Sequence, residues 1–247
     1  MDLLDILSKE KKLEDNKEFK KQTNSNLDQI IKLWEESLEW FPIPPKNYYL
    51  TIKDKLPAVS TADEIKEFNI MLNKYEDIFG FEQKAGLFIS GLINNCNEKN
   101  ITIITNHIEK PIDYLAAFTK YKNITIEGSV GFKFGMGMQC STATVNGNAH
   151  WCLGYLIEKT SITINGNVGG YLGDYMHSGT INVYGNAGNC VGMKMESGII
   201  NLFGKYDSID ATGNGRIYHN RKLILDNRGW LQKIKDFAKG DNQRLTL

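Results

Sequence analysis

Residues 162–173 read ITINGNVGGYLG, and this pattern decides the fold because it recurs along the chain at a step of nineteen residues. Each repeat holds glycines in the order G-x-x-G-x-x-x-G, which gives three glycine columns. The first column contains Gly128, Gly147, Gly166, Gly185 and Gly204. The middle column contains Gly131, Gly169 and Gly188, with His150 in place of a glycine. The last column contains Gly135, Gly154, Gly173 and Gly192. Such a fixed short repeat indicates a solenoid.

The residues before each first-column glycine have the alternation of a β-strand. Ile162 and Ile164 flank Thr163, and the same apolar–polar order returns in the neighbouring repeats. β-Branched pairs with glycine corners fit one coil of a β-helix, whereas the leucine and asparagine spacing of a leucine-rich horseshoe is absent. The sequence therefore predicts a mainly β fold, a single-stranded parallel β-helix with nineteen-residue coils. The handedness of parallel crossovers predicts that it is right-handed.

The glycines have two physical reasons to recur in the repeats of this chain. A sharp corner needs either a positive φ or room for the next coil to approach, and both favour a residue without Cβ. All twelve column glycines are therefore predicted to be structural corners. His150, in a glycine's place, is expected at an unusual backbone angle. Asn148, Asn167 and Asn186 also share a column, which predicts a hydrogen-bonded ladder between coils.

Composition excludes several classes of function. The 29 Lys and Arg residues balance the 29 Asp and Glu residues, so no net charge favours nucleic acid or an anionic membrane. No apolar run is long enough to span a bilayer, and the amino terminus does not have the pattern of a secretory signal. Cys152 and Cys190 share a column but lie two coils apart, about 9–10 Å at strand spacing, too far for a disulfide. These features together predict a cytoplasmic protein.

The sequence divides into two parts. Residues 1–98 are predicted to form an α-helical arm and an amino-terminal cap, and residues 99–247 the β-helix with a carboxy-terminal capping helix around Trp230–Phe237. Within the first part, the residues at 25–40 have a helical apolar stripe, those at 48–52 suit a short strand, and Thr61–Glu64 is a capping box. Residues 84–95 suit a further helix. Residues 99–121 read as an extra coil, with a step of twenty-three and additional residues within 111–118.

Three aromatic residues of the first part are candidates for docking: Trp34, Trp40 and Phe41. They could pack on the protein's own solenoid or on a partner, and the first alternative is favoured because an apolar stripe usually has a local target.

No motif in the chain predicts catalysis. The histidines lack ligand spacing, no C-x-x-C pair occurs, and neither a nucleophile elbow nor a Walker loop is present. Residues 166–170 could pass for a phosphate loop, but they lie on the nineteen-residue lattice and open no helix. We expect no catalytic residue, no cofactor-binding residue and no metal site.

The G-x-x-G-x-x-x-G coils resemble the GXGXG domain, which the carboxy-terminal part of the glutamate synthase large subunit shares with one of the subunits of formylmethanofuran dehydrogenase. The best matching stretches are 166–192, with the joint YMHSGTI at 175–181 and its repeat MESGII at 195–200. Residues 85–93 resemble the segment that leads into the glutamate synthase β-helix, and residues 215–219 its exit. The resemblance covers roughly residues 80–222 and implies a β-helix without catalytic residues of its own.

Three functions follow as expectations. The first is a non-catalytic subunit or domain of a glutamate synthase-like oxidoreductase complex, which positions amidotransferase or flavin-containing partner subunits. The second is the GXGXG component of a formylmethanofuran dehydrogenase-like complex, beside a molybdopterin subunit. The third is a stand-alone scaffold that associates with copies of itself. The lead-in and exit segments favour the first.

Overall fold

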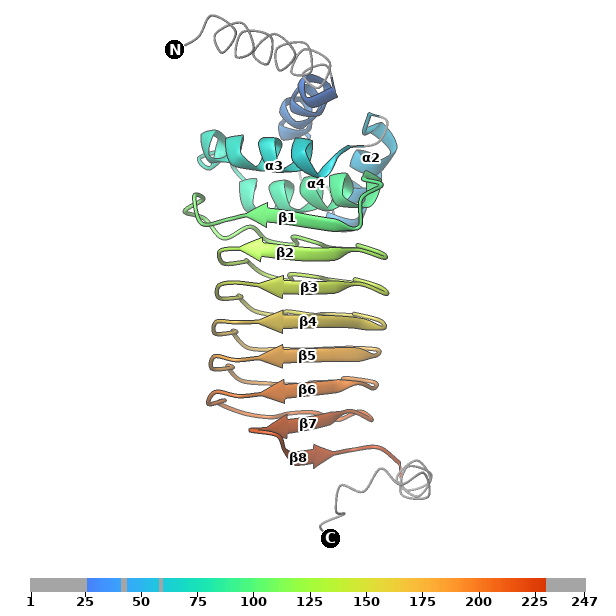
Figure 1. Ribbon diagram of the computed structural model, residues 1–247, viewed down its shortest axis with the longest axis vertical. Helices are drawn as coiled ribbons and strands as arrows, with labels where there is room; N and C mark the ends of the chain where they lie inside the picture. Colours follow the sequence, from blue (N-terminus) through green and yellow to red (C-terminus); the bar gives the residue numbers. More distant parts are fainter. Residues whose placement is uncertain (1–25, 41–43, 58–59, 230–247) are drawn as a thin grey trace, which may run out of the picture.

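The computed structural model describes residues 26–40, 44–57 and 60–229. They form a right-handed parallel β-helix with one strand per coil and a group of helices at its amino-terminal end (Figure 1). All the strands at the front except the last run in one direction, and each coil returns behind them while the chain descends (Figure 1). The predicted carboxy-terminal capping helix lies outside the described residues.

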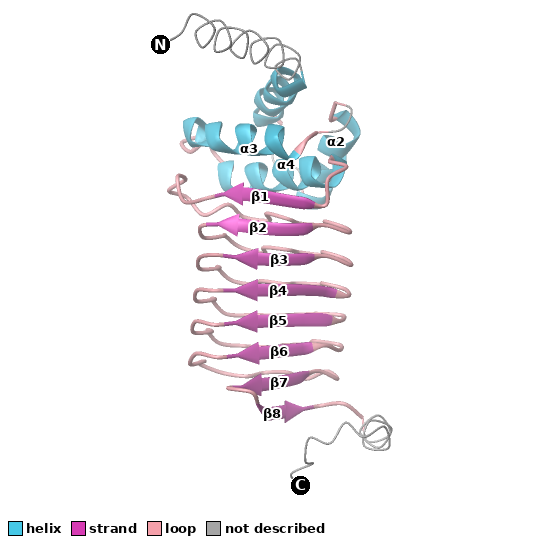
Figure 2. Cartoon of the chain, in the orientation of Figure 1, coloured by secondary structure: helices cyan, strands magenta, loops and turns pink. Residues whose placement is uncertain are grey.

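One sheet contains all the strands of the described part in sequence order, as Figure 2 shows. They are β1 (Asn100–Ile104), β2 (Asn123–Glu127), β3 (Thr142–Val145), β4 (Thr160–Ile164), β5 (Gly179–Val183), β6 (Ile199–Leu202), β7 (Arg216–His219) and β8 (Lys222–Asp226). The pairs from β1 to β7 are parallel, and β8 turns back antiparallel to β7. Asn123 pairs with Thr142, and Thr142 with Ser161, so the predicted nineteen-residue register is confirmed.

The first coil is longer than the others. Ile104 pairs with Glu127, twenty-three residues on. The Tyr114 N–H donates to the Phe132 carbonyl, and the Lys133 N–H donates in the same way to the Trp151 carbonyl. Tyr114 therefore corresponds to Lys133, and the nineteen-residue register holds again from Tyr114. The extra residues therefore lie in 105–113 and not, as predicted, in 111–118. They form a loop towards the cap, where the backbone N–H groups of Glu109 and Lys110 donate to the Glu76 carboxylate.

The inside of the β-helix is a solid apolar core. Each strand from β1 to β6 buries two apolar side chains at alternate positions, from Ile101 and Ile103 in β1 down to Ile200 and Leu202 in β6. Asparagine ladders run along the outside, since Asn148 Oδ1 accepts the Asn167 N–H at 2.8 Å and Asn167 Oδ1 accepts the Asn186 N–H at 2.8 Å. The predicted ladder is therefore present, with backbone N–H groups as its donors.

The cap consists of residues 26–38, which are helical, and of α2 (Pro45–Lys55), α3 (Ala62–Ile70), the 3-10 helix η1 (Met71–Tyr75) and α4 (Phe81–Asn95). The capping box is confirmed, because Thr61 and Glu64 exchange side-chain and backbone hydrogen bonds. The strand predicted at 48–52 is wrong, since these residues lie inside α2. A proline at the first position, where its missing N–H costs nothing, starts that helix.

Helix α4 lies directly on the first coil (Figures 1 and 2). A Cβ on Gly86 would stand 1.7 Å from the Asp113 carbonyl oxygen, so only glycine allows this contact. The Ser90 hydroxyl, which donates to the Gly86 carbonyl of its own helix at 2.6 Å, accepts the Ala117 N–H of the first coil at 3.0 Å. The buried Lys122 ammonium donates to the Cys96 and Glu98 carbonyls just after α4. The cap thereby closes the open end of the β-helix.

Candidate functional site

The aromatic residues predicted for docking are placed differently from one another. Trp34 is fully buried in the cap, and four rings lie 5.3–6.4 Å from it between centroids: Phe68, Tyr75, Phe81 and Phe88. Trp34 thus packs on its own chain, and docking to a partner does not apply to it. Trp40 is half-buried beside Tyr48, with the Lys55 ammonium 5.8 Å from its ring. Phe41 lies outside the described residues.

The glycine columns do two different jobs. Gly135, Gly154, Gly173 and Gly192, the last column, have φ between +69° and +73°. The later glycines of the first column have no such angle. A Cβ on Gly147, Gly166, Gly185 or Gly204 would stand 2.2–2.4 Å from the carbonyl oxygen of the glycine one coil earlier. The last column therefore needs glycine for its backbone angle, and the first for the close approach of coils.

The middle column is also limited by space. A Cβ on Gly169 would stand 2.6 Å from Cδ1 of Trp151, and one on Gly188 would stand 2.8 Å from the Gly170 nitrogen. His150, in the same column, does not have a positive φ. The prediction of an unusual backbone angle at His150 is therefore wrong, and at this one point of the column there is also room for a side chain.

Positive φ also occurs at non-glycine residues on both sides of the last column. Lys133, Cys152, Tyr171 and Cys190 precede it by two residues, and Leu156, Tyr175 and Lys194 follow it by two. Left-handed backbone costs an L-residue about 1–2 kcal/mol. All of these side chains are at least partly exposed. This backbone conformation therefore lines up reactive and aromatic side chains along one side of the β-helix.

Six residues of that side form what we call the Lys–Tyr cluster: Lys133, Cys152, Tyr155, Asp174, Tyr175 and Lys194. The two tyrosine rings lie 5.6 Å apart. The Lys133 ammonium is 4.9 Å from the Tyr155 ring centroid, and the Lys194 ammonium is 2.7 Å from the Tyr175 hydroxyl oxygen. The two lysines belong to different coils, and each approaches one of the paired rings.

Burial and charge perturb several pKa values in this cluster. Burial raises the pKa of the Asp174 carboxyl, and the ammonium groups of Lys194 and Lys133 oppose that change. Burial also raises the pKa of the Cys152 thiol, again against Lys133. The hydrogen bond with Tyr175 raises the pKa of Lys194. A set of perturbed groups at one surface marks a functional-site candidate. Because the thiol pKa of Cys152 is raised and not lowered, this set suits binding better than nucleophilic catalysis.

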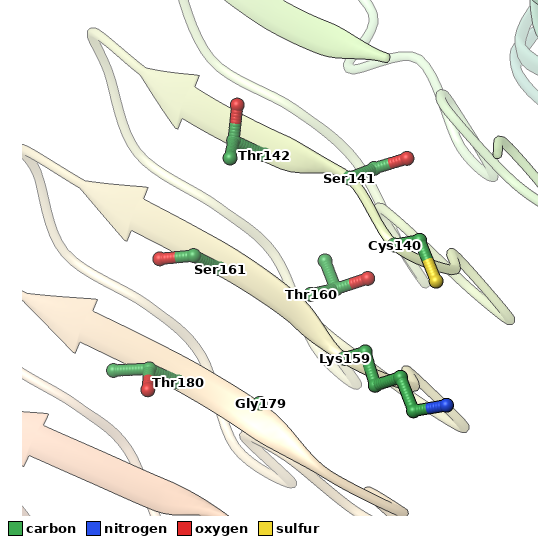
Figure 3. Close-up of a pocket in the computed structure, with 8 residues that line it drawn as sticks. All are labelled: Cys140, Ser141, Thr142, Lys159, Thr160, Ser161, Gly179 and Thr180. Carbon is green, nitrogen blue, oxygen red and sulfur yellow. The ribbon is translucent and has the colours of Figure 1, made fainter. Parts of the chain in front are cut away.

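A shallow depression of about 500 Å³ lies at the beginning of β3, β4 and β5 (Figure 3). It is lined by Cys140, Ser141, Thr142, Lys159, Thr160, Ser161, Gly179 and Thr180. Cys140 and Lys159 occupy its rim and point away from the strands (Figure 3). The Lys159 ammonium is 3.6 Å from a Glu158 carboxylate oxygen. The depression therefore exposes mainly apolar parts of hydroxyl-bearing side chains, with one already paired cation.

The histidines do not gather into a site. His177 Nδ1 lies 2.8 Å from a Glu196 carboxylate oxygen, and His219 Nε2 lies 3.0 Å from the Gly204 carbonyl oxygen. Among the residues that the structure describes, no three His, Cys, Asp or Glu side chains come together as ligands for a metal ion. No helix within this part of the chain has the length and apolarity to cross a membrane.

The Lys–Tyr cluster is not apparent from the linear sequence, although its signal is present there. Three of its pairs are nineteen residues apart: Lys133 with Cys152, Tyr155 with Asp174, and Tyr175 with Lys194. When the repeats are aligned by nineteen residues, as was done for the glycines, the two members of each pair fall in the same column and so lie on adjacent coils. The comparison of this chain with family models, with curated proteins and with solved structures gives no match.

Proposed function

We propose that this chain is a non-catalytic scaffold that positions partner subunits, in the manner of the glutamate synthase GXGXG domain that its coils resemble. The interior supports a surface function, because apolar columns fill it from the cap to the last parallel coil. The backbone N–H groups at the corners are largely used in bonds between successive coils. What such a molecule offers a partner is a rigid exterior.

The observation that carries the proposal is the outward face of β1 to β6, which we call the sheet face. Its outward-facing strand residues are Asn100, Thr102, Ile104, Asn123, Thr125, Glu127, Thr142, Thr144, Ser161, Thr163, Thr180, Asn182, Ile199 and Asn201. Only Glu127, at the end of β2, is charged, in a chain whose residues are 23% charged. Depletion of charge is typical of the centre of protein interfaces.

The proposal is tested by mixing the purified chain with the amidotransferase and flavin-containing synthase subunits of the same organism. We expect a complex that elutes as one species in size-exclusion chromatography with light scattering. Thr144→Lys places a charge in the centre of the sheet face, at a side chain that is partly exposed, and should abolish co-elution while the circular dichroism spectrum is retained. Lys205→Glu, on another side of the β-helix, is the matched control and should leave the complex intact.

Other outcomes decide against the proposal. Turnover of glutamine or ammonia by the chain alone would exclude a non-catalytic role. Co-elution with a molybdopterin subunit instead would select the formylmethanofuran dehydrogenase-like alternative. If light scattering of the purified chain alone gives a multiple of the chain mass, the alternative of a self-associating scaffold is favoured.

A further inference from the structure

The Lys–Tyr cluster contains more positive than negative charge, and its charges are not closely paired. Lys133 and Lys194 face one carboxylate, that of Asp174, which feels both of them electrostatically. Within the described part of the chain, neither ammonium has a carboxylate oxygen within 4.0 Å. The buried Asp174 Oδ1 has no hydrogen-bond partner there either. Both lysines therefore act on the same carboxylate, and neither is paired with it.

Rings hold the two ammonium groups in position. Lys133 Nζ lies 5.0 Å from the Phe132 ring centroid and 5.9 Å from that of Tyr114, in addition to Tyr155. Lys194 Nζ donates a hydrogen bond to the Tyr175 hydroxyl at 2.7 Å and lies 4.8 Å from the centroid of that ring. The cation–π contacts of Lys133 use none of the hydrogen-bond donors of its ammonium, and Lys194 keeps two of its three donors, so donors remain for a ligand.

The same side of the β-helix offers flat apolar surface. Trp151 is 48% exposed, and its ring lies 5.8 Å from that of Tyr171 at a tilt of 32°. Trp151 immediately precedes Cys152, so these rings border the cluster. A ligand here would meet cations at one end and aromatic surface at the other.

We propose that the Lys–Tyr cluster binds a small organic oxyanion, a carboxylate or phosphate group carried on a flat apolar body. The oxyanion accepts hydrogen bonds from the Lys133 and Lys194 ammonium groups, and the flat body packs on the surrounding rings. The Asp174 carboxylate repels the ligand and so limits its affinity. This site lies apart from the residues of the sheet face, and it requires no partner protein.

The test is a titration of the full chain with benzoate, phenyl phosphate and acetate, followed by calorimetry and by the amide NMR signals of residues 152–156 and 174–175. We expect benzoate or phenyl phosphate to bind more tightly than acetate, because only they have a flat body. The tighter of the two identifies the preferred head group. Acetate binding as tightly as both, or no shift of these signals with any probe, would overturn the proposal.

Variants that remove a positive or a negative charge distinguish binding at this site from a general attraction of anions to the protein. Lys133→Gln and Lys194→Gln should each weaken binding of the better probe about threefold or more. Asp174→Asn should tighten it about threefold, because it removes a repulsive charge. Lys159→Gln, a surface lysine of the Figure 3 depression, is the control and should change nothing. An equal loss with Lys159→Gln, or weaker binding with Asp174→Asn, would contradict the assignment.

Discussion

The cap and the β-helix reach stability by opposite means. In the cap, large rings fill a non-repeating core around Trp34. In the β-helix, each coil depends on positions where nothing larger than hydrogen fits, such as Gly166 and Gly185. The stability of the cap therefore depends on large side chains that fill its core, whereas the stability of the β-helix depends on positions that have no side chain. Substitutions should therefore have different consequences in the two parts.

The largest effect should come from Gly185→Ala. Its Cβ would stand 2.4 Å from the Gly166 carbonyl oxygen. Because that oxygen belongs to the backbone of the preceding coil, the clash can be relieved only if the two coils move apart. The loss should exceed about 5 kcal/mol, in the range of exceptional substitutions, and prevent the β-helix from folding. Gly173→Ala should cost only about 1–2 kcal/mol, because Ala116 already occupies the equivalent left-handed position in the first coil. Equal losses in urea denaturation would show that the two columns do not differ.

The next largest effect tests the cap. Trp34→Ala removes a fully buried ring and should cost about 3–5 kcal/mol. Tyr184→Ala removes an exposed ring of the β-helix that stacks on Phe203 at 4.7 Å, and should cost about 1 kcal/mol. Thermal unfolding followed by circular dichroism measures both. A larger loss for Tyr184 than for Trp34 would reverse the proposed division between the two regions.

A smaller effect is expected where the regions meet. Lys122→Met retains much of the side-chain volume but leaves the Cys96 and Glu98 carbonyls without their shared donor. The cost should be about 1–3 kcal/mol. Hydrogen exchange of α4 and β1 amides should then accelerate in both elements, and unchanged exchange in either would show that Lys122 does not join them.

The smallest effect concerns pH. Burial raises the pKa of the Asp174 carboxyl in the folded protein. As the pH rises above the usual aspartate value, the unfolded chain loses this proton before the folded protein does, so stability falls through that interval. Asp174→Asn should therefore stabilise the protein at neutral pH, by less than about 1 kcal/mol because the side chain is only partly buried, and leave it unchanged at acidic pH. A destabilised variant at neutral pH would contradict this sign.

The β-helix was predictable because its pattern is repeated. In-register glycine, isoleucine and asparagine columns specify the strands and their pairing, and β2 to β6 follow that register. The resemblance to the GXGXG domain and the partners that it implies stay predictions. The left-handed backbone at Lys133 and Tyr175 could not be predicted, since L-residues in that conformation follow no residue preference of the kind that marks glycine.

The cap was less predictable because it does not repeat. The Thr61 capping box is a local signal, and it correctly marks the start of α3. Residues 48–52 have strand-like composition, yet tertiary packing against α4 and the prolines before them place these residues in a helix. The Lys–Tyr cluster was missed for a different reason, since it depends on side chains in several coils and forms no linear motif.

The loop at 105–113 shows that one coil can be lengthened while the strands on either side keep their pairing. The corresponding corner of later coils, between the first glycine and Lys133, Cys152 or Tyr171, is therefore a natural point for insertion. A peptide tag or small reporter placed there would be displayed from the flank of the rod. Several such insertions, one per coil, would place the inserted groups in a row at the strand spacing of about 4.8 Å.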